Sequence, residues 1–147
     1  MVIWSRDVWL PAIAGASAFW VTNLAISLTP VAAEYRAALS ISYLPMLEEA
    51  AIGGTVIGLF VSWTLARFPD RVPGRNPLTK ALLLCFAALL VVTALIEVPG
   101  KLLAPVDRPV HNLAVAAGFN VVRIFALGLV IGLMRLRDAR LAHESGG

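Results

Sequence analysis

Four apolar stretches dominate this chain and leave little room for any other structure. They lie at residues 8–33, 50–66, 81–96 and 112–134. A helix needs about 20 residues to cross a hydrocarbon core of roughly 30 Å, so four crossings use most of the 147 residues. Charged residues make up only 14% of the chain, whereas soluble domains carry about 25%. The sequence therefore predicts one all-α domain, an integral membrane bundle of four transmembrane helices.

Local signals refine the limits of these spans. Pro45 suits the first turn of a second helix, where backbone N–H groups lack partners, and the turn-rich segment 67–77 cannot continue it. Pro99-Gly100 is expected to end the third span, and residues 34–44 predict a short interfacial helix or loop. The first stretch is longer than the apolar core of a signal peptide, so a retained helix is expected. The predicted spans are about 8–30, 45–66, 78–98 and 112–134.

The basic residues are divided unevenly between the two ends of the predicted bundle. One end holds Arg6, Arg67, Arg71, Arg75, Lys80, Arg135, Arg137 and Arg140. The other end holds only Arg36, Lys101 and Arg108. Because cytoplasmic loops carry the excess of Arg and Lys, both termini are predicted to be cytoplasmic. The excess of Arg over Lys favours a bacterial source, hence a bacterial plasma membrane. The clustering of these charges beside membrane spans argues against nucleic acid as a partner.

Arg123 is a lone charge inside the fourth span, and a charge at membrane depth is a functional-site hypothesis by default. Asn120 is three residues earlier and shares its helix face. Side chains tilt towards the N-terminus of their helix, so Arg123 and Glu97, on antiparallel spans, are expected to lean towards each other. Asn23 falls in the same layer. The predicted polar cluster in the outer half of the membrane consists of Asn23, Glu97, Asn120 and Arg123, with Glu48, Glu49 and His111 at its mouth.

Three interpretations of this cluster stay open. In the first, Arg123 and Glu97 form a structural ion pair that fixes helix register. In the second, the cluster lines a binding or transport cavity for a hydrophobic or anionic small molecule, or for a lipid headgroup. Its ligand-binding residues would then be Asn23, Glu97, His111, Asn120 and Arg123. In the third, a carboxylate acts as acid or base on a lipophilic substrate. The candidates for that role are Glu48, Glu49 and Glu97.

The first two interpretations favour a transporter, a lipid-handling protein or an accessory subunit. The third gives the alternative, a membrane-embedded enzyme of isomerase, cyclase or hydrolase type. No metal, phosphate-loop or nucleophile motif is present in the sequence, so no cofactor or metal is expected. A chain this short can barely enclose a pathway, which favours a homo-oligomer or a larger membrane complex. The glycine pairs Gly54/Gly58 and Gly128/Gly132 permit close helix contacts, either at an oligomer interface or within the bundle.

Overall fold

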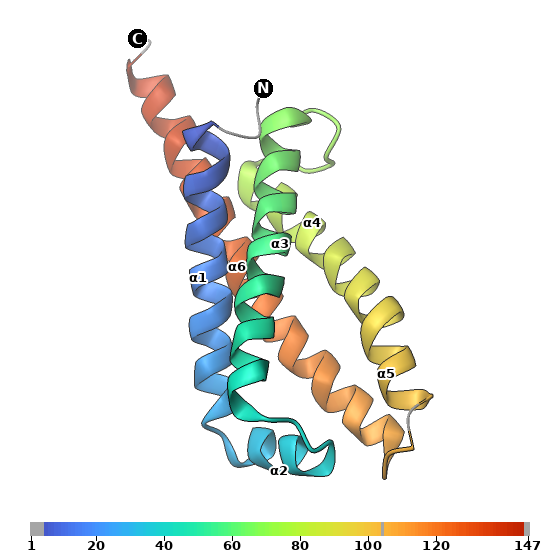
Figure 1. The fold of residues 1–147 in the computed structure, drawn as a ribbon. Coiled ribbons are helices and arrows are strands. Elements are labelled where there is room, and N and C mark those ends of the chain that lie inside the picture. The colour runs from blue at the N-terminus through green and yellow to red at the C-terminus, as the bar shows by residue number, and fades with distance from the viewer. Residues whose placement is uncertain (1–4, 104, 146–147) are drawn as a thin grey trace.

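The computed structural model describes residues 5–103 and 105–145, and this part of the chain contains helices and turns but no strand. Its long helices are α1 (Arg6–Ser27), α3 (Tyr43–Arg67), α4 (Pro77–Val92) and α6 (Pro109–Ser145). They alternate in direction, so the start of α1 and the end of α6 lie at the same end of the bundle, which we call the termini end (Figure 1). The short helix α2 (Pro30–Ala38) marks the opposite end, here the α2 end.

The prediction of a four-helix membrane bundle is confirmed. Among the described residues, four helical runs are long and apolar enough to cross a membrane. They are Arg6–Ser27, Tyr43–Arg67, Pro77–Leu102 and Pro109–Glu144. The last run is part of a 37-residue helix, which at 1.5 Å per residue is about 55 Å long. Since this exceeds the hydrocarbon thickness, the arginine-rich end of α6 projects beyond the bundle (Figure 1).

Capping residues set two helix starts. The Thr29 side chain accepts a hydrogen bond from the Ala32 N–H, and Pro30 stands in the first turn of α2. This cap divides the first apolar stretch, so α1 ends at Ser27, before the predicted limit, and α2 begins before the predicted interfacial segment. Asn76 caps α4 in the same way, with its Oδ1 accepting from the Thr79 N–H at 2.8 Å.

The third span does not end at Pro99-Gly100, so that prediction is wrong. α4 continues through a π-helical segment, η2 (Thr93–Glu97), into α5 (Val98–Leu102). The Val98 N–H donates to the Thr93 carbonyl, five residues back, as in a π turn. Pro99 then falls in the first turn of α5, the part of a helix in which proline is best tolerated. Consequently Lys101 stays on the same helical run as Glu97.

Glycines bring the helices close together inside the bundle. α1 packs against α3 and α6, and α4 packs against α6. A Cβ atom on Gly58 would lie 2.7 Å from the Ala12 carbonyl oxygen in α1, and one on Gly128 would lie 2.6 Å from the Cys85 Sγ in α4. The glycine pair of α3 therefore contacts α1 and that of α6 contacts α4. Of the two alternatives for these glycine pairs, packing within the bundle is the one observed.

Candidate functional site

Arg123 is held in the interior of the bundle by two neutral amides and a ring. Its Nη1 donates to the Asn23 Oδ1 in α1 at 2.6 Å, and its Nη2 donates to the Asn120 Oδ1 one turn earlier in α6. The guanidinium carbon lies 5.2 Å from the centre of the Phe19 ring, within reach of a cation–π attraction. Asn23 and Asn120 are each only 3% exposed. The sequence therefore predicted correctly that Asn23, Asn120 and Arg123 come together.

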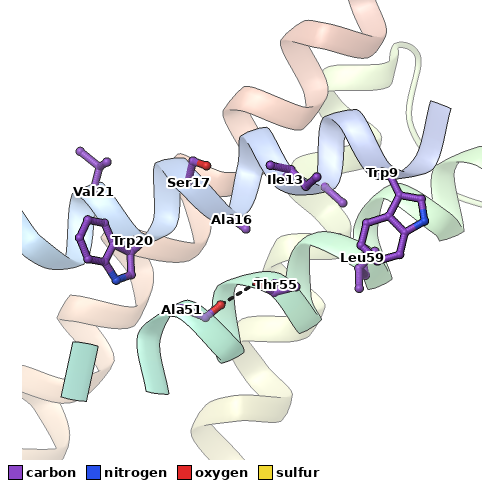
Figure 2. A pocket seen from close by; sticks show the side chains of 10 residues that line it. Trp9, Ile13, Ala16, Ser17, Trp20, Val21, Ala51, Thr55 and Leu59 are labelled. Carbon is purple, nitrogen blue, oxygen red and sulfur yellow. Dashed lines mark hydrogen bonds between the residues drawn. The ribbon is translucent and has the colours of Figure 1, made fainter. Parts of the chain in front are cut away.

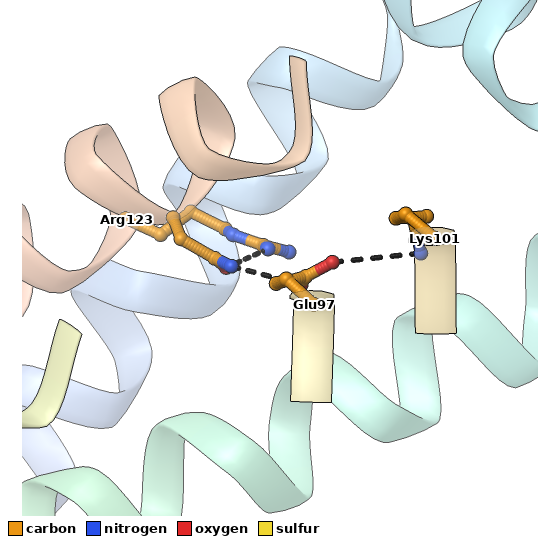
Figure 3. A network of polar contacts seen from close by, with 4 residues as sticks. Glu97, Lys101 and Arg123 are labelled. Carbon is orange, nitrogen blue, oxygen red and sulfur yellow. Dashed lines mark hydrogen bonds and ion pairs between the residues drawn. The ribbon is translucent and has the colours of Figure 1, made fainter. Parts of the chain in front are cut away.

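Glu97 joins this group through Asn120. The Asn120 Nδ2 donates to one carboxylate oxygen of Glu97 at 2.9 Å, and the Lys101 Nζ lies 3.5 Å from the other. Figure 3 shows the resulting line of contacts from Arg123 to Lys101. No ion pair joins Arg123 directly to Glu97 in the described chain, so the predicted direct pair is wrong. The reason is that Asn120 lies between the two charges while Lys101, one turn from Glu97, takes the free oxygen.

The π turn orients Glu97 towards this network. Ala81, Cys85 and Leu89 form the buried face of α4, at intervals of four residues. In a regular α-helix Glu97 would lie about 80° around the axis from Leu89. A π turn contains more residues than an α turn, so η2 returns Glu97 towards the buried face and α6.

Two residues of the network were missed from the sequence. Lys101 has the four-residue spacing from Glu97 that is typical of helical ion pairs, but Pro99-Gly100 indicated a helix end between them. Tyr35 lies in the segment predicted to be interfacial, yet its ring lies 5.6 Å from the Lys101 Nζ and packs edge-on against Phe119. Burial raises the pKa of the Tyr35 hydroxyl above its usual range, against the opposing effect of the Lys101 ammonium.

The network borders a cavity of about 200 Å³ at the α2 end, which we call the Arg123 cavity. Its polar lining consists of Asn23, Ser27, Tyr35, Arg36, Glu49, Glu97, Lys101 and Arg123, and its apolar lining includes Ile41, Met46 and Ile96. Three of these side chains are cationic and two are carboxylates. The Asn23 Nδ2 and the Arg123 Nε are buried and have no hydrogen-bond partner. The cavity thus has an excess of positive charge, and two buried donors of its lining residues are unused.

The other predicted site residues are distributed differently. Glu49 lines the Arg123 cavity from α3, whereas Glu48 is exposed and does not line it. His111 is exposed and lines a separate cavity of about 380 Å³, together with Glu34, Asp107 and Arg108. The prediction that His111 belongs to the mouth of the cluster is therefore wrong, because His111 lines a neighbouring cavity that shares only Tyr35 with the Arg123 cavity.

A larger groove of about 430 Å³ lies between α1 and α3 (Figure 2). Trp9 and Trp20 line it, and the Trp20 Nε1 donates to the Leu47 carbonyl at 3.2 Å. The Thr55 hydroxyl donates to the Ala51 carbonyl at 2.8 Å. No charged side chain lines this groove among the described residues. Its chemistry suits contact with acyl chains and offers nothing for recognising a charge.

No protein-family model matches the chain, and neither the curated proteins nor the solved structures include one that matches it. The described residues contain no group of three or more His, Cys, Asp or Glu that could hold a metal ion.

Proposed function

We propose that this protein is a small lipid-handling membrane protein that binds the anionic head of an amphiphilic molecule in the Arg123 cavity. The observation that carries the proposal is the state of the Arg123 charge. Its guanidinium is held by two neutral amide oxygens, while the nearest carboxylate, Glu97, is engaged by Asn120 and Lys101. Neutral acceptors orient a guanidinium without cancelling its charge, so the site favours an anion.

The hydrogen-bond donors support the same conclusion. A guanidinium has five N–H groups, and the two bonds to Asn23 and Asn120 use two of them. The Arg123 Nε is buried without a partner, as is the amide nitrogen of Asn23. Buried donors without partners are unfavourable. Carboxylate or phosphate oxygens would supply the missing acceptors, and such charge-assisted bonds are among the stronger polar contacts in proteins.

The size of the cavity indicates which part of a ligand enters. Its volume of about 200 Å³ lies below the roughly 300–1,000 Å³ of pockets that enclose drug-sized molecules. A headgroup fits, but a complete amphiphile does not. Ile41, Met46 and Ile96 line the same cavity, and Ile96 is 64% exposed. The proposed ligand therefore places its head against Arg123 and its chain along these residues and in the bilayer.

We propose the plasma membrane of a bacterium as the location, with both termini cytoplasmic. The support is the unequal count of Arg and Lys residues, eight at the termini end against three at the α2 end. In this orientation the Arg123 cavity faces the outer half of the membrane. A reporter fused after Gly147 tests the orientation, since activity of a periplasm-specific reporter would contradict it.

The enzyme alternative has weaker support. Glu97 is engaged on both carboxylate oxygens, and Glu48 lies outside the cavity.

We also propose that the chain works in a homo-oligomer or larger complex, because a single four-helix bundle can barely enclose a transport pathway. Measuring the mass of the protein in mild detergent tests this proposal, and a strict monomer would count against it.

The binding proposal is tested by thermal denaturation in an uncharged detergent with added decyl phosphate, decanoate or decanol. Ligand at about 100 times its Kd stabilises the folded state by about 2.7 kcal/mol. We expect both anions to raise the Tm of the wild type and of Arg140→Gln, an exposed control at the far end of α6. Decanol should give no shift.

Arg123→Gln should lose the response, and Arg123→Lys should recover little of it, because lysine lacks the planar fork. Equal shifts in wild type and Arg123→Gln, each against its own baseline, would refute the proposal.

A further inference from the structure

A second concentration of positive charge lies at the termini end, where α4 begins. It surrounds a cavity of about 160 Å³, here the basic cavity. The lining residues are Leu65, Pro69, Arg75, Asn76, Pro77, Lys80 and Arg135. Three of them are cations, and none of them is a carboxylate. The loop after α3, the first turn of α4 and the middle of α6 therefore bring three positive charges to one small space.

The local structure holds two of these cations, Lys80 and Arg135, in place. Gly74 has φ +138°, a conformation that other residues rarely adopt, and a Cβ there would lie 3.0 Å from the Lys80 Cγ. This glycine lets the loop fold closely over the start of α4. The Arg135 Nη2 donates to the carbonyl oxygens of Asp7 at 2.6 Å and Ser62 at 3.3 Å, while its Nε is buried without a partner. Arg135 is thus anchored to α1 and α3 with a donor unused.

No negative charge on the lining of the basic cavity balances its three cations. The Lys80 ammonium donates to the Pro69 carbonyl, a neutral acceptor that uses one of its three N–H groups. The carboxylates of Asp7 and Asp138 act on Arg135, but neither lines the cavity. Three like charges around one small space repel one another unless an anion lies between them.

The position of the basic cavity indicates which anion is available. The second candidate span ends at Arg67 and the third begins at Pro77, so the cavity lies at the limit of the hydrocarbon region, where lipid phosphates are found. Basic pockets between transmembrane helices are typical sites for anionic headgroups. A volume of 160 Å³ corresponds to about five water molecules at roughly 30 Å³ each, which is enough for a phosphate but not for a chain.

We propose that the basic cavity binds the phosphate group of an anionic phospholipid at the termini end of the bundle. The planar guanidinium group of Arg75 suits a phosphate, since it can direct two N–H groups at the phosphate oxygens. Arg135 adds its positive charge and the N–H groups that its backbone contacts leave unused. The Lys80 ammonium adds a third charge from α4. This inference is independent of the Arg123 cavity, because the two cavities share no lining residue and lie at opposite ends of the bundle.

The test is native mass spectrometry of detergent-purified protein incubated with phosphatidylglycerol, phosphatidylcholine or inorganic phosphate. The site variant is Arg75→Gln/Lys80→Gln, which keeps the backbone contacts of Arg135. The matched control, Arg137→Gln/Arg140→Gln, removes the same charge from exposed positions on α6. Circular dichroism and Tm establish that both variants are folded. Because Lys80 also contacts the loop, Arg75→Gln alone serves as a second site variant.

We expect wild type and control to bind phosphatidylglycerol equally, and the site variant at least about tenfold more weakly, because charge-assisted bonds are lost. Arg75→Gln should fall between them, and the same order should hold when every variant also carries Arg123→Gln, which removes binding at the Arg123 cavity. If only inorganic phosphate binds with this dependence, the phosphate site stands but its natural ligand is soluble rather than a lipid. If the site variant binds both probes as well as the control does, the proposal is overturned.

Discussion

Replacing Asn120 by alanine tests the arrangement of the polar network most directly. Asn120 donates to Glu97 and accepts from Arg123, so the substitution removes two charge-assisted hydrogen bonds at a residue that is 3% exposed. Side-chain hydrogen bonds between transmembrane helices contribute on average about 0.6 kcal/mol each and at most about 1.7. We therefore expect Asn120→Ala to lower the free energy of unfolding by about 1–3 kcal/mol, a fall in Tm of several degrees.

The informative measurement is a double-mutant cycle between Arg123→Gln and Glu97→Gln, performed with Asn120 present and again in the Asn120→Ala background. The readout is thermal or denaturant unfolding in mild detergent, followed by circular dichroism. Because Asn120 connects the two charges, their coupling energy should be appreciable in the first cycle and close to zero in the second. Cycles of this kind isolate the interaction between two groups.

Asn112→Ala provides the control. Asn112 lies on the same helix, is 4% exposed and donates one hydrogen bond to the Asp107 carbonyl at 2.8 Å. Its loss should destabilise the protein by a similar or smaller amount, without changing the coupling between Arg123 and Glu97. If that coupling stays undiminished after Asn120→Ala, the two charges interact directly and the bridged arrangement is refuted.

Two further predictions concern packing and titration. Gly58→Ala places a Cβ against the Ala12 carbonyl, a backbone atom that cannot move aside easily, and should destabilise the protein by about 1–3 kcal/mol. Gly53→Ala meets no atom within 4 Å and should be neutral or stabilising by up to about 1 kcal/mol; equal losses of Tm in both variants would contradict the packing. Tyr35 should titrate above its ordinary pKa of about 10. The neutral hydroxyl is favoured in the folded state, so stability should fall as pH rises through 10 towards the raised pKa. Tyrosinate absorbance of Tyr43→Phe protein measures this, and a midpoint at or below 10 would contradict the burial of Tyr35.

The sequence predicted the membrane bundle well because its strongest signal, hydrophobic length, depends on bilayer thickness rather than on tertiary detail. It also predicted which residues share a layer, since Asn23 on the first span and Asn120 and Arg123 on the fourth occur at matching depths. Depth follows from counting residues along a helix. The direction of a side chain around the helix axis can be predicted only while the helix is regular. In the third span the π-helical segment η2 interrupts the regular α-helix.

Two errors, the end of the third span and the partner of Glu97, have a common origin in Pro99-Gly100. Pro99-Gly100 indicated a helix end, but the π segment before it lets the helix continue to Leu102. This continuation kept Lys101 within one turn of Glu97 and gave the carboxylate a partner that the sequence did not reveal. The glycine pairs were ambiguous for a different reason. Small residues indicate a close contact but do not identify which helix makes it.

Glu97 contacts Asn120 and Lys101 rather than Arg123, and this decides whether Arg123 can bind an anion. In a direct pair the carboxylate would have cancelled the guanidinium charge, and the network would have served only to fix helix register. Instead, Glu97 binds Lys101 and the Asn120 amide, and Arg123 keeps two neutral acceptors. The same contacts that orient the guanidinium therefore leave its charge available in the wall of the cavity. Structural and binding roles are compatible here. The two asparagines that orient Arg123 in the membrane are neutral, so they do not balance its charge, and an anion can still bind it.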